Sequence, residues 1–128
     1  MKKILVVDDE EDIRRLVQKR LVQSGYDAHT AADGKIAFEM CKATKFDLVI
    51  MDIAMPIMDG YETCVQLKGT AATKDIPVLL FTAKDLEPKA IAQHYDELGV
   101  AGYLAKLCSF EELLEKIGEV INEDKGEK

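Results

Sequence analysis

The residues most able to do chemistry in this sequence stand at the ends of short apolar runs. Asp8 and Asp9 follow the first run, Asp52 the third and Thr82 the fourth, while Lys106 stands just beyond the fifth. If the runs are parallel strands, these side chains meet at one edge of a sheet, because functional crevices in such sheets lie at the carboxyl ends of the strands. The pattern predicts three carboxylates, a hydroxyl and an ammonium group in one site.

This set of side chains predicts a divalent cation and a phosphate partner. Carboxylates packed closely together repel one another unless a cation neutralises them. Oxygen ligands that leave room for water suit Mg²⁺, which often completes its coordination with a phosphate oxygen. Lys106 would then pair with the phosphoryl oxygens as a point charge, and Thr82 would donate a hydrogen bond to them.

Five runs rich in branched apolar residues predict the strands that position these groups. They lie at residues 4–7, 26–30, 48–51, 78–81 and 102–104. Three of them are almost continuously apolar, as expected for parallel strands that are covered on both faces.

Segments with helical apolar spacing separate the strands. The first ends at Gly25, and three more are expected at about 34–43, 61–68 and 88–98. The last begins at Ser109, which stands at capping-box spacing from Glu112, and it carries one apolar stripe. Five alternations of strand and helix predict an α/β fold with a parallel sheet and helices on both faces. We expect one domain at 1–122 and a charged tail at 123–128.

Composition restricts the possible functions. With 128 residues and 48% apolar content, the chain is sized for one ordinary globular domain. A formal net charge of -7 disfavours direct binding to nucleic acid or to a membrane surface. The three cysteines form no C-x-x-C pair, so they predict neither a disulfide framework nor a zinc site. The first apolar run is too short for a signal peptide, and a cytoplasmic location is expected.

Four motifs, in order and spacing, resemble the response-regulator receiver domain of two-component signalling over essentially the whole chain. They are Asp8-Asp9, the run from Asp52 through Pro56 to Asp59-Gly60, Phe81-Thr82-Ala83, and Tyr103-Leu104-Ala105-Lys106. The resemblance implies a flavodoxin-like fold with a doubly wound five-stranded sheet in the order 2-1-3-4-5 and five helices.

The resemblance also implies a role for each site residue. Asp52 would accept the phosphoryl group, and Asp9, Asp52 and the backbone carbonyl of Ala54 would bind Mg²⁺ directly. Asp8 would act through a water molecule. By the same resemblance, Lys106 would bind the phosphoryl group. Thr82 and Tyr103 would be the switch residues.

The implied partners are proteins of a signalling relay. The donor would be a phosphohistidine on a sensor histidine kinase or a phosphotransfer protein, and the downstream target is unknown. The domain would catalyse only its own phosphorylation and dephosphorylation, so it is not expected to be an ordinary enzyme. Whether an output domain belongs to the protein stays open.

One position departs from the family pattern. Leu107 follows Lys106, where the family usually has a proline in a cis peptide. Because a cis bond before a non-proline residue costs about 2.5–4 kcal/mol, we predict a trans bond there.

Several alternatives compete with this interpretation. The acidic run from Asp8 to Asp12 is also compatible with a solvated helix start, Thr82 with an ordinary strand residue and Tyr103 with a partly buried aromatic ring. A flavin carrier would need a phosphate-binding loop that an acidic cluster repels. A phosphatase of the haloacid dehalogenase type would need a second aspartate at the position of Ala54. The principal alternative is a receiver-like interaction module that no longer switches by phosphorylation.

Overall fold

The computed structural model describes residues 1–52, 60–82, 100–105 and 109–124. The strands are β1 (Lys3–Val7), β2 (Asp27–Ala31), β3 (Leu48–Asp52), β4 (Val78–Thr82) and β5 (Gly102–Ala105). The described helices are α1 (Glu11–Gln23), α2 (Gly34–Ala43), α3 (Gly60–Lys68) and α5 (Phe110–Asp124). The helix predicted at 88–98 lies outside the described residues.

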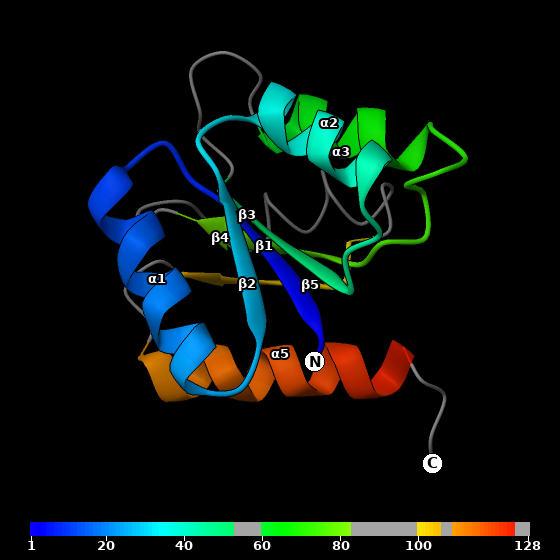
Figure 1. Ribbon diagram of the computed structural model, residues 1–128. Coiled ribbons are helices and arrows are strands. Elements are labelled where there is room, and N and C mark those ends of the chain that lie inside the picture. Colours follow the sequence, from blue (N-terminus) through cyan, green and yellow to red (C-terminus); the bar gives the residue numbers. More distant parts are fainter. Residues whose placement is uncertain (53–59, 83–99, 106–108, 125–128) are drawn as a thin grey trace.

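The five strands form one parallel sheet in the order β2-β1-β3-β4-β5, which confirms the predicted topology. Helices α2 and α3 lie on one face of this sheet, and α1 and α5 lie on the other (Figure 1). The order of the strands reverses direction between β1 and β3, so the connections after these two strands leave on opposite sides of the sheet.

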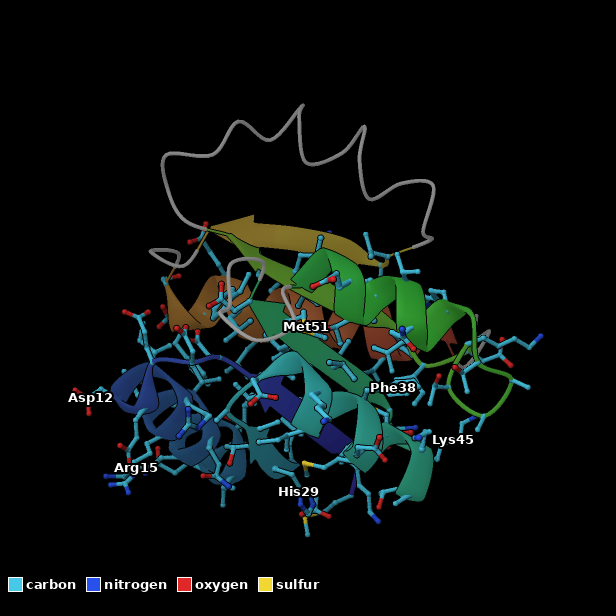
Figure 2. The ribbon with its side chains drawn as sticks, turned by 90° about the horizontal axis from the view of Figure 1, so that it is seen from above. Asp12, Arg15, His29, Phe38, Lys45 and Met51 are labelled. Carbon is cyan, nitrogen blue, oxygen red and sulfur yellow. The ribbon has the colours of Figure 1, made fainter. Side chains whose placement is uncertain are left out.

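Side chains alternate along each strand and so build two cores. Leu5 and Val7 of β1 belong to the core under α2 and α3, whereas Ile4 and Val6 belong to the core under α1 and α5. Both sets are almost fully buried, because helices cover both faces of the sheet. Figure 2 shows Met51 of β3 in the middle of the molecule and Arg15 of α1 at its periphery.

The helix ends follow local sequence signals. Gly25 has a φ of 97°, and the amide of Tyr26 donates to the Leu21 carbonyl at 3.0 Å, which closes α1 with a Schellman motif. At the start of α5 the Ser109 amide donates to Glu112 Oε1 at 2.8 Å, and the Glu112 amide donates to Ser109 Oγ at 3.1 Å. This reciprocal pair confirms the predicted capping box.

The strands extend slightly beyond their apolar runs. β3 includes Asp52 and β4 includes Thr82, although the sequence predicts ends at 51 and 81. Strand pairing uses backbone groups, so the ladder continues through a polar residue when the neighbouring strand is present. Asp52 and Thr82 are therefore the last residues of their strands and not the first residues of loops.

Two of the three cysteines lie in the core of the protein. Cys41 of α2 and Cys64 of α3 are both buried thiols. Burial raises the pKa of the Cys41 thiol to about 12, so this group is protonated and unreactive at neutral pH. Cys108 lies outside the described residues.

Candidate functional site

The pairing of β1 with β3 brings together the aspartates at the ends of these two strands. β1 and β3 pair in parallel up to Val7 and Met51, so Asp8 and Asp52, the next residue of each chain segment, reach the same edge of the sheet. On the other side of β3, Asp52 pairs with Phe81. The backbone of Thr82 therefore ends β4 one residue beyond the level of Asp52.

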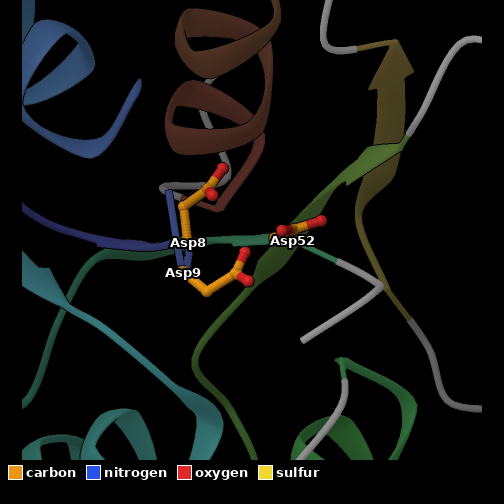
Figure 3. A group of neighbouring side chains, drawn as sticks. All are labelled: Asp8, Asp9 and Asp52. Atoms are coloured by element: carbon orange, nitrogen blue, oxygen red, sulfur yellow. The ribbon is translucent and has the colours of Figure 1, made fainter. Parts of the chain in front are cut away.

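Three carboxylates converge at this edge. Oxygen atoms of Asp8, Asp9 and Asp52 all lie within 4.8 Å of one another. Figure 3 shows Asp8 and Asp9 at the end of β1 and Asp52 at the end of β3. Asp8 is 1% exposed and Asp52 is 3% exposed, whereas Asp9 is open to solvent. The site thus has a buried floor of two carboxylates and one accessible carboxylate beside them.

Backbone and side-chain contacts fix the geometry of Asp8. Its amide donates to the Ala31 carbonyl of β2 at 3.2 Å, and its Oδ1 accepts a hydrogen bond from the Glu10 amide at 2.9 Å. The Arg14 side chain of α1 donates from Nη1 to the Asp8 carbonyl at 2.8 Å. Three hydrogen bonds therefore hold Asp8 at the start of the loop between β1 and α1.

The donor set fits a hard divalent cation. All of its atoms are carboxylate oxygens, which bind Mg²⁺ and Ca²⁺ in preference to softer metals. Three negative charges this close together repel, and the repulsion is stronger for the two buried groups because water screens them less. A bound cation relieves that repulsion, and the exposed side chain of Asp9 leaves the site accessible from solvent.

The family comparison places this acidic group in a known context. The model of the response regulator receiver domain matches residues 4–118, which is most of the chain. The chain belongs to the response regulator receiver family. Receiver domains act in two-component signalling and generally bind Mg²⁺ at an acidic pocket, and the convergence of Asp8, Asp9 and Asp52 in this receiver domain agrees with that feature.

Curated relatives of this receiver domain include regulators from bacteria. The chain is 40% identical over 120 residues to the alkaline phosphatase synthesis transcriptional regulatory protein PhoP of Bacillus subtilis. The matched region covers 94% of this chain and 48% of PhoP. The chain is 35% identical over 125 residues to the response regulator MprA of Mycobacterium tuberculosis, which covers 98% of the chain and 53% of MprA. The chain spans about half the length of these relatives.

Solved structures agree with the family assignment. The chemotaxis response regulator CheY4 of Vibrio cholerae is 34% identical, with a TM-score of 0.86 over 94% of this chain and 98% of CheY4. The N-terminal domain of a response regulator receiver protein from Methanoculleus marisnigri is 40% identical, with a TM-score of 0.76 over 94% of this chain and 96% of that one. The fold of the receiver domain is therefore shared over nearly its whole length.

The other predicted site residues fall outside the described part of the receiver domain. Ala54, Lys106 and the Lys106–Leu107 peptide bond lie in undescribed segments. Thr82 and Tyr103 have described backbones, at the end of β4 and opposite Leu80 in β5, but their side chains are outside the described set. Their predicted roles and the predicted trans bond remain predictions.

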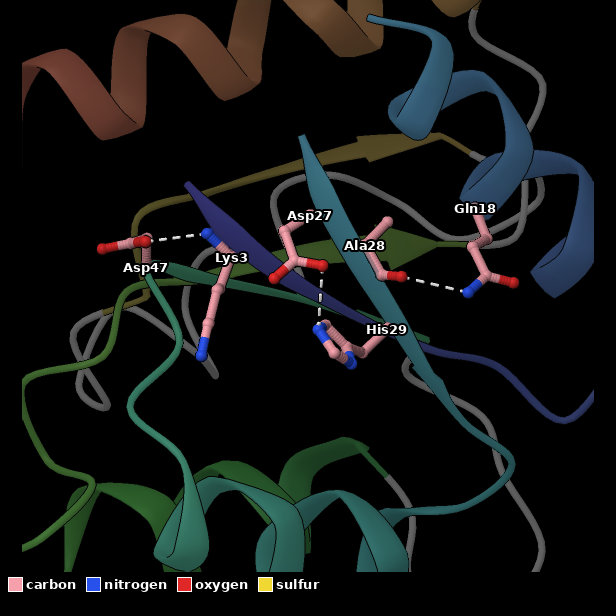
Figure 4. Close-up of polar contacts among 6 residues, drawn as sticks. All are labelled: Lys3, Gln18, Asp27, Ala28, His29 and Asp47. Carbon is pink, nitrogen blue, oxygen red and sulfur yellow. Dashed lines mark hydrogen bonds and ion pairs between the residues drawn. The ribbon is translucent and has the colours of Figure 1, made fainter. Parts of the chain in front are cut away.

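Two further features lie apart from the acidic group. A groove of about 260 Å³ between α1 and α5 is lined mainly by apolar side chains, with Arg20 stacked 4.4 Å above the Phe110 ring. Its apolar lining does not suit a phosphate. In β2, His29 Nε2 lies 3.1 Å from Asp27 Oδ1, as Figure 4 shows, and the His29 ring meets Phe46 edge-on. The sequence assigned His29 no role.

The sequence reasoning missed Arg14. Its contact with Asp8 spans six positions, from α1 back to the end of β1. Neither helical nor strand periodicity pairs residues at that separation, so periodicity could not reveal the contact. An arginine early in a helix that follows an acidic run is the one available signal.

No helix among the described residues is both long enough and apolar enough to cross a membrane.

Proposed function

We propose that this receiver domain is a phosphorylation-dependent switch that accepts a phosphoryl group on Asp52 with the help of Mg²⁺. The observation that supports the proposal most directly is the convergence of Asp8, Asp9 and Asp52 at the carboxyl edge of the sheet. Asp52 is the member of this group that ends the central strand β3, and it is buried.

The proposed reaction is an in-line phosphoryl transfer. A carboxylate oxygen of Asp52 forms a bond to phosphorus while the bond from phosphorus to the donor breaks, and the product is an acyl phosphate on Asp52. The donor is a phosphohistidine of a sensor kinase or phosphotransfer protein. Because the transition state is loose, the protein contributes mainly position and charge neutralisation. Mg²⁺ supplies positive charge to the phosphoryl oxygens when it is bound.

The residues around Asp52 then have distinct tasks. Asp9 and the Ala54 carbonyl bind the cation together with Asp52, and Asp8 holds a water molecule of its hydration shell. Lys106 pairs with the phosphoryl oxygens. Within this group, Asp8 and Asp9 come from the end of β1, and their placement beside Asp52 supports their part of the proposal.

The switch itself is proposed to involve the hydroxyl of Thr82 and the ring of Tyr103. Thr82 donates a hydrogen bond to the phosphoryl group, and Tyr103 moves inward in response, which changes the partner-binding face around β5 and α5. A phosphoryl group favours this arrangement because it bonds to it better than to the other. The domain works in the cytoplasm. Residues 1–122 form the receiver and 123–128 the charged tail, although α5 extends two residues past this boundary, to Asp124.

Labelling with a small phosphodonor tests the proposal. The purified protein is incubated with acetyl phosphate and Mg²⁺, and its intact mass is compared with that of a sample containing excess chelator. We expect a mass increase of one phosphoryl group that requires Mg²⁺, disappears on treatment with hydroxylamine and maps to the peptide containing Asp52. The exposed Asp75 provides a matched control, because Asp75→Asn should be labelled normally.

The same experiment decides against the principal alternative. An interaction module that has lost phosphorylation would show no mass increase at any Mg²⁺ concentration. Labelling that maps to a peptide without Asp52 would also contradict the proposal, because the acceptor would then lie elsewhere.

A further inference from the structure

Arg14 lies beside the acidic site but is not part of it. Its Nη1 atom donates to the backbone carbonyl of Asp8 at 2.8 Å, and the side chain is partly buried. Its own amide donates to the Glu10 carbonyl at 3.0 Å, in the first turn of α1. The backbone bond of Arg14 closes the first turn of α1, and its side chain ties that turn to Asp8, the residue that follows β1.

From this contact we infer that Arg14 is a positioning residue for the divalent cation: it fixes the peptide plane that orients Asp9. The inference rests on the proposed function, because it assigns the acidic group to Mg²⁺. It concerns a residue that touches neither the cation nor the phosphoryl group.

The planarity of the peptide bond carries the argument. The Asp8 carbonyl and the Asp9 amide belong to one rigid plane, so a hydrogen bond to that carbonyl sets the direction in which the Asp9 backbone leaves β1. Asp9 is exposed, so core packing does little to restrain it, whereas Asp8 is buried and also held by the Glu10 amide. Asp9 is thus the carboxylate that depends most on the contact with Arg14.

The charge of Arg14 and its hydrogen bond make opposite predictions. A cationic guanidinium near the site repels Mg²⁺, so removal of the charge alone would tighten binding. Removal of the hydrogen bond frees the peptide plane, misplaces Asp9 and weakens binding. The sign of the change therefore separates a positioning role from a purely electrostatic one.

Arg15 provides a matched control on the next position of the same helix. Its Nη2 atom pairs with Glu11 Oε2 at 2.7 Å, and its side chain is 74% exposed. Figure 2 shows Arg15 on the outer side of α1. Arg15 has the same charge and the same helix propensity as Arg14, and its ion pair with Glu11 stays within α1.

Mg²⁺ titrations of four proteins test the inference: the unaltered chain, Arg14→Met, Arg14→Lys and Arg15→Met. Met keeps the apolar stem without charge or donor, and Lys keeps the positive charge and an N–H donor group. We expect Arg14→Met to weaken Mg²⁺ binding by about tenfold, the range found for residues that orient metal ligands, and Arg14→Lys to restore most of it. Arg15→Met should bind as the unaltered chain does.

The amide resonance of Asp9 in the metal-free protein is the second measurement, because it reports on the peptide plane itself. We expect it to shift in Arg14→Met, to return towards its original position in Arg14→Lys and to stay in place in Arg15→Met. Urea unfolding with chelator shows whether Arg14→Met is folded under the conditions of the titration. If it is unfolded there, the comparison of Arg14→Lys with Arg15→Met decides, because a positioning role leaves a measurable deficit in the former only.

Unchanged or tighter Mg²⁺ binding in a folded Arg14→Met protein would overturn the inference, as would an equal loss in Arg15→Met. A chain that binds no Mg²⁺ would overturn it as well. Failure of the proposed function looks different: Asp52 would then not be labelled by acetyl phosphate, although the order of the four Mg²⁺ affinities could still follow the expectation.

Discussion

Two acidic stretches of this protein have similar composition and different structural fates. One runs from Asp8 to Asp12 at the end of β1, and the other is α5, with Glu111, Glu112, Glu115 and Glu119 among its described acids. In the first stretch, Asp8 is buried beside Asp52 and Asp9 completes the group. In the second, all four glutamates are exposed.

Position in the fold explains the difference. The first stretch follows a central strand, and the end of that strand lies beside the end of β3. The acids of α5 share a helix with a buried stripe of Leu113, Ile117, Val120 and Ile121, which turns them toward solvent. There Glu112 caps the helix and Glu119 lies 3.7 Å from Lys116. Clustered acids become a candidate site only where the tertiary structure brings a third carboxylate from another strand.

The largest expected effect is on phosphoryl labelling, and it distinguishes the proposed nucleophile Asp52 from the solvent-exposed acids. Asp52→Asn should reduce acetyl phosphate labelling below detection, because the amide is nearly isosteric with the carboxylate but is not an anionic nucleophile. Glu115→Gln in α5 removes the same charge and should leave labelling unchanged. Intact-mass spectrometry of both variants is the measurement. Normal labelling of Asp52→Asn would refute the assignment of the acceptor.

The next effect concerns the metal. Asp9→Ala should weaken Mg²⁺ binding by at least about tenfold, since it deletes a proposed ligand outright and residues that merely support ligands already have effects of that size. Glu111→Ala is the control in the second acidic stretch and should bind Mg²⁺ normally. Calorimetric titration at low ionic strength measures both. Equal affinities of the two variants would place the cation away from Asp9.

A smaller effect is expected on stability, where an acid of α5 matters and the metal site does not. Ser109→Ala or Glu112→Ala removes half of the capping box and should lower the free energy of unfolding by about 1 kcal/mol. Ser24 is the C-cap residue of α1, and Ser24→Ala should have little effect on the free energy of unfolding. Urea denaturation measures the change, and Mg²⁺ affinity should not move. A loss of Mg²⁺ affinity without a loss of stability would contradict this division of roles.

The smallest effect is expected for an exposed ion pair. Glu119→Gln breaks the contact with Lys116 and should change the free energy of unfolding by less than about 0.5 kcal/mol, because the Glu119 side chain is 60% exposed and water screens the pair. The same urea experiment measures it. A change as large as that of Ser109→Ala would show that the pair is better shielded than its exposure indicates.

Much of the fold could be predicted because its signals are local. Apolar runs of three to five residues marked the strands, Gly25 marked the end of α1, and Ser109 with Glu112 marked the start of α5. The predicted ends of β2, β3, β4 and β5 were each one residue short. At β3 and β4 the reason is that backbone pairing does not stop where the apolar side chains stop. The order of the strands came from the resemblance to the receiver family and not from the apolar pattern itself.

By itself, the sequence determined which residues stand at the strand ends, since alternating strands and helices put Asp8, Asp9 and Asp52 at one edge of any parallel sheet built in this way. Only the tertiary structure decided how near they lie, that Asp8 and Asp52 are buried while Asp9 is not, and that Arg14 holds the Asp8 carbonyl. The physical reason is that periodicity encodes which face of an element is apolar. Distances between separate elements depend instead on how all the buried side chains pack together.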